Sequence, residues 1–155
     1  MQPFVKKVHA FLIKKRKTLA VAESCTGGLI SKLLTELPGS SSYFSLGVVT
    51  YSNKAKEKIL KIPGQLIAKK GAVSIEVARK MASSVRRISG ADFGIGVTGI
   101  AGPGGATAAK PVGTVFIAIA GKHETLCKKF KFSGSRNTIR KKAALESLRL
   151  LGTFL

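Results

Sequence analysis

Serine and lysine, rather than histidine, are the residues with which this sequence could perform hydrolytic chemistry. The chain contains 2 histidines and 2 cysteines, and neither histidine lies in a motif near Cys25. A hydroxyl nucleophile needs a base, and a neutral lysine can replace histidine in that role. Lys56 is the candidate base. Tyr51 precedes it by five residues across an expected strand-to-helix turn, so the two side chains could converge.

A lysine acts as a base only when its amine is neutral, which near pH 7 requires a pKa roughly three units below the ordinary value. Partial burial and neighbouring positive charges both lower a lysine pKa. The neighbours of Lys56 include Lys54, Lys58 and Lys61. The alternative interpretation is an exposed basic helix on which every lysine is merely solvated.

A second candidate segment, Glu23-Ser-Cys-Thr-Gly-Gly28, separates an apolar strand from a helix. Ligands of open α/β sheets gather where strands end, and glycines at a helix start expose backbone N–H groups to an anion. The segment is not a Walker-type nucleotide motif. The alternative is a tight turn capped by Thr26. A thiol nucleophile at Cys25 is a weaker candidate, because no histidine motif accompanies it.

The third candidate segment is the glycine-rich loop Gly99-Ile-Ala-Gly-Pro-Gly-Gly105, which belongs to a connection of about 13 residues. Loops of that length in a compact domain are usually functional. Its backbone N–H groups could hold a phosphate or carboxylate, and Thr98 could add a hydroxyl at the preceding strand end. The alternative is a flexible connection between two strands.

The elements that must position these segments alternate between helices and strands. Hydrophobic periodicity and capping residues predict helices over about 3–17, 29–37, 53–60, 65–70, 75–89 and 136–151. Apolar runs predict strands over 18–22, 46–51, 93–97, 112–120 and 124–132. Ile75, Ala78, Met81, Ala82, Val85 and Ile88 form the expected buried stripe of the helix over 75–89. This order favours helices on both sides of a mixed sheet.

Composition restricts the class of protein further. The 155 residues suit one domain, and 27 basic against 7 acidic residues give a net charge of +20. This charge favours a protein that binds an anionic substrate or a nucleic acid, or one from a lineage whose proteins are generally basic. The few cysteines and histidines exclude a zinc finger and favour a reduced, cytoplasmic setting. No apolar run is long enough to span a membrane. The basic N-terminus resembles a transit peptide, but its apolar residues share one helical face, which favours a docked helix.

Taken together, the motifs resemble one known family along about residues 4–151. The matching segments occur in order: Ala22-Glu-Ser-Cys-Thr-Gly-Gly28, Pro38-Gly-Ser-Ser41, Tyr51-Ser-Asn with Lys56, Gly71-Ala-Val-Ser74, Val97-Thr-Gly-Ile-Ala-Gly-Pro-Gly-Gly105 and Lys110-Pro-Val-Gly-Thr114. The sequence is similar to the CinA C-terminal domain family, the nicotinamide mononucleotide deamidases also called PncC. The combination of motifs is far more specific than any one of them.

The resemblance implies a single α/β domain over 1–155, a three-layer α/β/α sandwich with a mixed central sheet. It implies a homo-oligomeric hydrolase that converts nicotinamide mononucleotide to nicotinate mononucleotide and ammonia, without metal or cofactor. Many members also carry an N-terminal nucleotide-processing domain. This chain starts at the deamidase helix, so we expect that second activity to be absent.

The resemblance also implies catalysis by a serine, a lysine and a tyrosine. Lys56 and Tyr51 match, and two serines compete for the remaining role. We favour Ser41 as nucleophile, with Ser24 orienting the substrate or stabilising the oxyanion, while the reverse assignment stays open. The expected substrate-binding residues are Thr26, Gly27, Gly28, Thr98, Gly99, Gly102, Gly104, Gly105, Arg136 and Arg140.

Two departures from the family pattern bear on substrate binding. Ala108-Ala109 stands where a charged residue often precedes Lys110-Pro111, and Gly134-Ser-Arg136 replaces Gly-Asp-Arg. The retained arginine still allows pairing with a phosphate or carboxylate, through Arg136 or Arg140. The competing functions are a basic, DNA-associated binding protein and a silent relative that only binds nucleotide. Dispersed basic residues without aromatic neighbours favour only weak, salt-dependent nucleic-acid binding.

Overall fold

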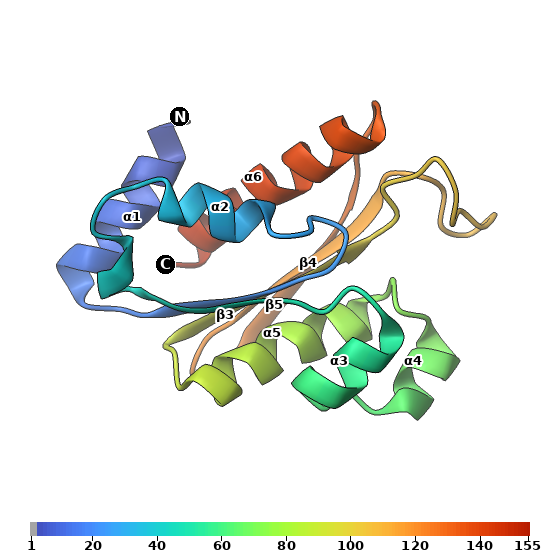
Figure 1. Ribbon diagram of the computed structural model, residues 1–155, viewed down its shortest axis with the longest axis horizontal. Coiled ribbons are helices and arrows are strands. Elements are labelled where there is room, and N and C mark those ends of the chain that lie inside the picture. Colours follow the sequence, from blue (N-terminus) through green and yellow to red (C-terminus); the bar gives the residue numbers. More distant parts are fainter. Residues whose placement is uncertain (1–2) are drawn as a thin grey trace.

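The computed structural model describes residues 3–155, in which a five-stranded mixed sheet has the order β2-β1-β3-β4-β5 (Figure 1). The strands are β1 (Leu19–Glu23), β2 (Phe44–Val49), β3 (Phe93–Gly99), β4 (Thr114–Ala120) and β5 (Thr125–Lys131). The helices are α1 (Pro3–Lys15), α2 (Leu29–Thr35), α3 (Asn53–Leu60), α4 (Gly64–Lys70), α5 (Ile75–Ser89) and α6 (Arg136–Phe154), with a short 3₁₀ turn, η1, at Ser40–Ser42.

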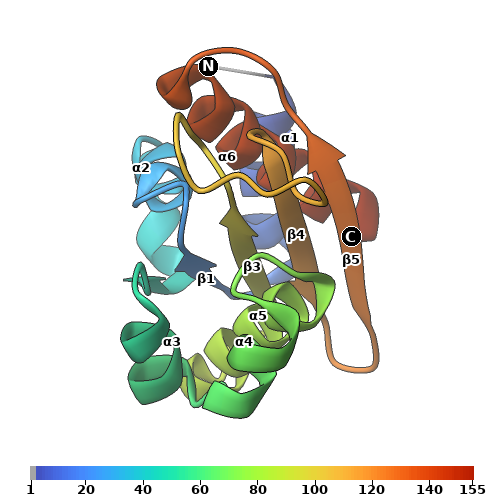
Figure 2. The same ribbon diagram turned by 90° about the vertical axis from the view of Figure 1, so that its right-hand side faces the viewer.

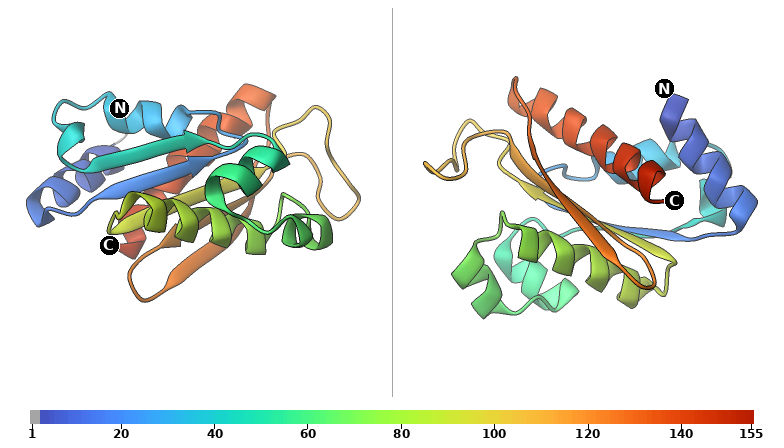
Figure 3. Two further views of the ribbon diagram at one scale, coloured as in Figure 1. Left: turned by 60° about the horizontal axis from the view of Figure 1, so that its bottom comes forward. Right: turned by 180° about the vertical axis from the view of Figure 1, so that it is seen from behind.

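Helices cover both faces of the sheet, as the sequence predicts. The helices α1, α2 and α6 lie on one face, whereas α3, α4 and α5 lie on the other (Figures 1 and 3). Each layer buries its own apolar cluster against the sheet. The strand β4 lies between both layers and is buried at every position, which explains its uninterrupted apolar sequence. The protein is therefore a three-layer α/β/α sandwich.

Parallel pairing brings three strand ends to one edge of the sheet. Strand β1 pairs in parallel with both β2 and β3, whereas β4 and β5 continue the sheet in antiparallel orientation. The carboxyl ends of β1, β2 and β3 consequently lie side by side. Figure 2 looks onto this edge, where the long loop after β3 crosses in front of the strands. Ligands of open α/β sheets bind at such an edge, next to the point where the strand order reverses.

Helix α5 lies unusually close to β3 because two glycines of that strand carry no side chain. A Cβ at Gly94 or Gly96 would overlap the backbone of Ala82. The helix begins at Ser74, whose hydroxyl accepts the N–H of Val77 at 3.3 Å. This close contact fixes the end of β3 relative to the α5 layer.

The structure corrects two details of the sequence-based expectations. Ile75 and Ile88, expected in the buried stripe of α5, are 42% and 49% exposed and lie at the two ends of the helix. Strand β2 begins at Phe44 rather than at residue 46. The N-terminal helix does dock, since Val5, Val8 and Leu12 of α1 are buried.

Residues 3–155 contain neither a candidate membrane-spanning helix nor a candidate metal-binding cluster. None of the helices in that range combines the length and the apolar character that crossing a membrane requires. Within the same residues, no group of three or more histidine, cysteine, aspartate or glutamate side chains is arranged to hold a metal ion.

Candidate active site

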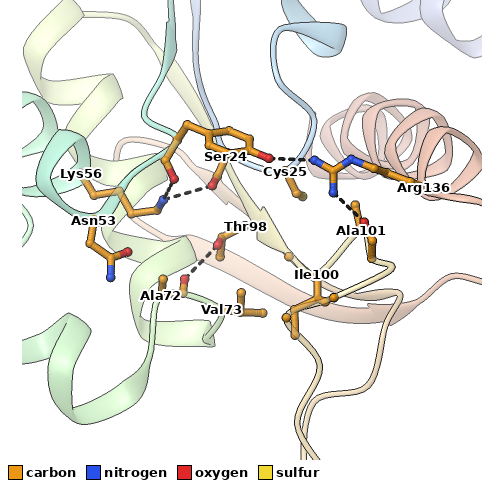
Figure 4. A pocket seen from close by; sticks show the side chains of 15 residues that line it. Ser24, Cys25, Asn53, Lys56, Ala72, Val73, Thr98, Ile100, Ala101 and Arg136 are labelled. Carbon is orange, nitrogen blue, oxygen red and sulfur yellow. Dashed lines mark hydrogen bonds between the residues drawn. The ribbon is translucent and has the colours of Figure 1, made fainter.

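The amine of Lys56 and the hydroxyl of Ser24 form the centre of the candidate site (Figure 4). Lys56 Nζ lies 3.0 Å from Ser24 Oγ, 2.8 Å from the carbonyl oxygen of Thr50 and 3.2 Å from that of Tyr51. Ser24 follows β1 and Lys56 belongs to α3, after β2. The parallel pairing of β1 and β2 therefore brings together two residues that are far apart in the sequence.

Burial, rather than crowding by like charges, lowers the pKa of Lys56. The side chain is 1% exposed, and removal from water disfavours its charged form, while the sulfur of Cys25 acts in the opposite direction. The flanking lysines Lys54, Lys58 and Lys61 are exposed on the solvent side. The expectation that they depress the Lys56 pKa therefore needs correction. No salt bridge within residues 3–155 involves the Lys56 amine.

The turn that presents Ser24 is held from one side by the preceding residue, Glu23. Its carboxylate is buried and accepts the N–H groups of Gly28, Ile30 and Ser31 at 2.9, 3.1 and 2.9 Å, besides the Ser31 hydroxyl. Glu23 is thus the cap of α2, and the Thr26 hydroxyl, which the sequence suggested for that role, has no hydrogen-bond partner in the described part of the chain. A carboxylate at a helix start also offsets the helix dipole.

Gly27 and Gly28 allow the backbone of this turn to adopt its conformation. Gly27 has φ +58° and Gly28 has φ +96°, both in the left-handed region that glycine enters without strain. Gly27 N–H donates to Ser24 O at 3.1 Å, and Gly28 N–H donates to Glu23. The two N–H groups that were expected to hold an anion are therefore engaged within the chain.

Arg140 holds the same turn from the other side. Its guanidinium donates to the carbonyl oxygens of Cys25 and Thr26 at 3.2 and 3.0 Å. Arg140 does not line the cavity described below, although the sequence suggested that it could contact substrate. The structure gives it a positioning contact with the backbone that follows Ser24.

Arg136 connects the third segment to the tyrosine. Its guanidinium donates to Gly102 O at 2.6 Å and to the Tyr51 hydroxyl at 2.8 Å. Arg136 is the first residue of α6, whereas Gly102 lies in the loop after β3. These contacts join the loop, Tyr51 and α6 around one opening. The Tyr51 ring remains 59% exposed at that opening.

These groups surround a cavity of about 280 Å³. Its lining combines the three segments: Ser24, Cys25, Tyr51, Asn53, Lys56, Ala72, Val73, Thr98, Gly99, Ile100, Ala101, Gly102, Gly104, Gly105 and Arg136. The Thr98 hydroxyl donates to Ala72 O at 2.8 Å, which joins β3 to the segment before α5. None of these lining residues is acidic, so the cavity suits an anionic ligand.

Ser41, which the sequence favours as the nucleophile, lies away from Lys56. It belongs to η1, which precedes β2, whereas Lys56 follows β2. The six residues of β2 separate the two ends by roughly 20 Å. Ser41 is exposed and does not line the cavity. The serine that the structure places beside Lys56 is Ser24, the alternative that the sequence left open.

Both cysteines are thiols that resist ionisation. Burial raises the pKa of Cys25 to about 12, and burial likewise raises the pKa of Cys127 to about 11. Because the thiolate is the nucleophilic form, Cys25 is a poor nucleophile although it lines the cavity.

Three features of the site were absent from the sequence-based hypothesis. Glu23 belongs to a recognised motif but had no predicted role, because its hydrogen bonds to Ile30 and Ser31 form only when α2 packs over it. Asn53 and the pair Ala72–Val73 line the cavity. Gly71-Ala-Val-Ser74 was one of the segments shared with the resembled family, and that was the available signal for the last two residues.

A family model for the CinA C-terminal domain matches residues 1–155. Among curated relatives, a CinA-like protein of Geobacter sulfurreducens is 51% identical over 135 residues, which are 87% of this chain and 33% of that protein. A CinA-like protein of Desulfotalea psychrophila is 53% identical over 144 residues, 93% of this chain and 35% of the relative. The chain spans about a third of the length of these relatives.

Solved structures of similar size share the fold. A CinA superfamily protein of Escherichia coli superimposes with a TM-score of 0.94 at 32% identity, over 98% of this chain and 88% of that one. A competence/damage inducible protein of Agrobacterium tumefaciens gives a TM-score of 0.90 at 36% identity, over 97% and 95% of the two chains. By its sequence and by its fold, the chain belongs to the CinA C-terminal domain family.

Proposed function

We propose that this chain is an amidase that hydrolyses the carboxamide of nicotinamide mononucleotide, with Ser24 as the nucleophile and Lys56 as the base. One observation carries the proposal: a buried lysine amine, unpaired with any carboxylate in residues 3–155, lies 3.0 Å from a serine hydroxyl inside a cavity. Burial favours the neutral amine that the reaction needs. The substrate follows from the family resemblance.

The hydrogen bonds of Lys56 orient its amine for proton transfer. In the neutral form, the two remaining N–H groups donate to the carbonyl oxygens of Thr50 and Tyr51. The nitrogen lone pair then points toward Ser24, whose hydroxyl becomes the donor. The carbonyls therefore select the geometry in which lysine accepts a proton.

The reaction proceeds in two halves. Lys56 takes the proton of Ser24 as the oxygen attacks the carboxamide carbon, and the lysine then gives that proton to the departing ammonia. Water next attacks the acyl-enzyme with Lys56 again as base, and the Ser24 hydroxyl is restored with release of the carboxylate. The sum is amide plus water giving carboxylate plus ammonia. The positive pyridinium ring of the substrate already activates its carbonyl.

A backbone N–H next to the nucleophile is available for the developing oxyanion. Ser24 N–H donates to Val97 O at 3.1 Å and is occupied. The Cys25 N–H makes no hydrogen bond to another residue of the described chain, and Cys25 lines the cavity. Arg140 holds the carbonyl oxygens of Cys25 and Thr26, which restrains the turn that follows Ser24. A preorganised donor of this type contributes about 3–4 kcal/mol to transition-state stabilisation.

The phosphate of the substrate would lie toward Arg136 and the glycine-rich loop. Two of the five guanidinium N–H donors of Arg136 are engaged with Gly102 and Tyr51, which leaves others for an anion. Gly104 and Gly105 line the cavity without side chains, so a ligand can approach their backbone.

Release of ammonia is the direct test. We expect the wild type to release ammonia from nicotinamide mononucleotide faster than from nicotinamide riboside, and slowest from free nicotinamide. Lys56→Met should abolish release while circular dichroism stays unchanged. A folded wild type that is inactive on all three compounds would refute the proposal.

A further inference from the structure

Asn53, the first residue of α3, lines the cavity with a side chain that the helix itself does not use. An asparagine at the start of a helix often caps it. Here Ser52 has that role, because its hydroxyl accepts the N–H of Ala55 at 3.0 Å. Figure 4 shows no hydrogen bond between the Asn53 side chain and any other residue that lines the cavity. The side-chain amide of Asn53 is therefore available to a ligand.

Helix α3 places this amide beside the candidate base. Asn53 and Lys56 are three residues apart on the helix, and residues at that spacing lie on the same face. Both line the cavity, and Figure 4 shows the Asn53 side chain next to that of Lys56, with Arg136 on the opposite side of the view. The Asn53 amide therefore lies at the end of the cavity where the amide bond would be cleaved, away from the proposed phosphate site.

Asn53 supplies a hydrogen-bond acceptor that the other lining side chains lack. Among the side chains of residues 3–155 that line the cavity, only that of Asn53 has a carbonyl oxygen, and none is a carboxylate. A primary carboxamide carries two N–H donors, and a donor that leaves water without finding an acceptor weakens binding. The oxygen Oδ1 of Asn53 can accept one of these donors beside the reacting carbon.

The proposed reaction fixes the side of the cavity toward which the substrate's amino group points. The carbonyl oxygen of the substrate lies toward the Cys25 N–H, the donor proposed for the oxyanion. Lys56 must reach the amide nitrogen, because it gives that nitrogen the proton with which ammonia departs. The amino group therefore points toward α3, where Asn53 shares a face with Lys56. A hydrogen bond to Asn53 Oδ1 strengthens as the nitrogen gains positive charge in this step.

We propose that Asn53 Oδ1 accepts a hydrogen bond from the amino group of the substrate's carboxamide and thereby makes the site selective for primary amides over esters. The inference rests on the proposed function and adds to it the residue that recognises the leaving group. An ester of the same acid has an alkoxy group in place of the amino group, so it has no N–H to donate to Asn53. A site that binds a donor group in this way discriminates against an analogue that lacks it.

The kinetic test compares two substrates in each variant, nicotinamide mononucleotide and the methyl ester of nicotinate mononucleotide. We expect Asn53→Ala to lower kcat/KM for the amide by about tenfold or more and that for the ester by less than about threefold. A purely structural role would lower both values equally. Asn53→Asp keeps an acceptor oxygen and should retain the preference for the amide. Lys54→Ala is the matched control, because Lys54 is exposed on the same turn of α3, and both values should stay unchanged.

Calorimetric binding to proteins that carry Ser24→Ala separates recognition from turnover. Adding Asn53→Ala should weaken binding of nicotinamide mononucleotide by about tenfold and leave binding of the methyl ester unchanged. Equal losses for both ligands, or no loss for the amide, would overturn the role of Asn53, whereas ammonia release by the wild type would keep the proposed function standing. An inactive wild type whose amide binding still depends on Asn53 would refute the proposed function and support the recognition. Failure to bind either ligand would overturn both.

Discussion

Lys56 Nζ lies 3.0 Å from Ser24 Oγ, and no carboxylate within residues 3–155 neutralises the amine. The pair is formed by the turn after β1 and by helix α3, which follows the adjacent parallel strand β2. Its lysine is 1% exposed, and its three acceptors are one hydroxyl and two backbone carbonyls. This environment stabilises a neutral amine beside an alcohol, which is what a serine amidase without histidine requires.

Substitution of either member of the pair should remove the chemical step. We expect Ser24→Ala and Lys56→Met to lower kcat for ammonia release by about a thousandfold or more. Lys56→Arg should be equally inactive, because a guanidinium cannot give up its proton. Ser41→Ala should change kcat less than tenfold. A large loss in Ser41→Ala with an active Ser24→Ala would reverse the assignment of the nucleophile.

Activity should rise with pH as Lys56 loses its proton. Burial lowers the Lys56 pKa, so the rise occurs below the range in which an ordinary lysine titrates. A profile of kcat/KM against pH reports this ionisation in the free enzyme. A rate that falls as pH rises through this range would exclude lysine as the base.

The same lowered pKa should appear in the free energy of unfolding. The unfolded chain binds more protons than the folded one between the lowered pKa and the ordinary value. Stability contributed by this group therefore rises with pH across that window and is flat below it. Urea unfolding of wild type and Lys56→Met at several pH values should show this rise only in the wild type. Parallel curves would mean that the Lys56 pKa is unshifted.

Arg136 should matter most for the phosphorylated substrate. Arg136→Ala removes the contacts to Gly102 and Tyr51 and the proposed phosphate partner. We expect KM for nicotinamide mononucleotide to rise tenfold or more, with a smaller change for nicotinamide riboside. Arg149→Ala, near the other end of α6, is the control. Equal effects on both substrates would assign Arg136 to loop positioning alone.

Glu23 should contribute to stability more than an exposed cap does. Glu23→Ala leaves three backbone N–H groups and a hydroxyl without their acceptor. Loss of this buried cap should lower the free energy of unfolding by about 3–5 kcal/mol. Glu23→Gln keeps a carbonyl oxygen and should lose less. If urea unfolding showed less than 1 kcal/mol of loss in the alanine variant, roughly the effect of an exposed cap, the capping interpretation would be wrong.

Thiol reagents should leave the enzyme active. The pKa values of Cys25 and Cys127 are raised by burial to about 12 and about 11, so neither ionises near neutral pH. We expect full ammonia release after treatment with iodoacetamide at pH 8, and an active Cys25→Ala variant. Rapid inactivation, prevented by substrate, would instead point to a thiol nucleophile.

Hydrophobic pattern and capping residues were enough to predict the layers of the fold. Each expected helix and strand is present, because Ser52, Ser74 and Gly90 mark helix ends as local chemistry requires. The strand order was not accessible in this way. It depends on which strands pair, and a pattern of apolar residues does not encode the partner of a strand.

The sequence predicted which segments form the site, but not which of their residues contact one another. The three loops and Lys56 could be identified from residue types, since glycine and hydroxyl residues follow apolar strands. The choice between Ser24 and Ser41 depended on the strand pairing. Parallel pairing places Ser24, at the end of β1, beside the end of β2 that leads to Lys56, whereas Ser41 lies before the start of β2. The contacts of Arg140 and Glu23 likewise arise only when α6 and α2 pack on the turn.

The most direct measurement is ammonia release from nicotinamide mononucleotide by the wild type and Ser24→Ala, assayed side by side with both proteins shown to be folded. We expect steady release by the wild type and a loss of about a thousandfold or more in the variant. Equal release by the two proteins would contradict it, as would the absence of release by the wild type.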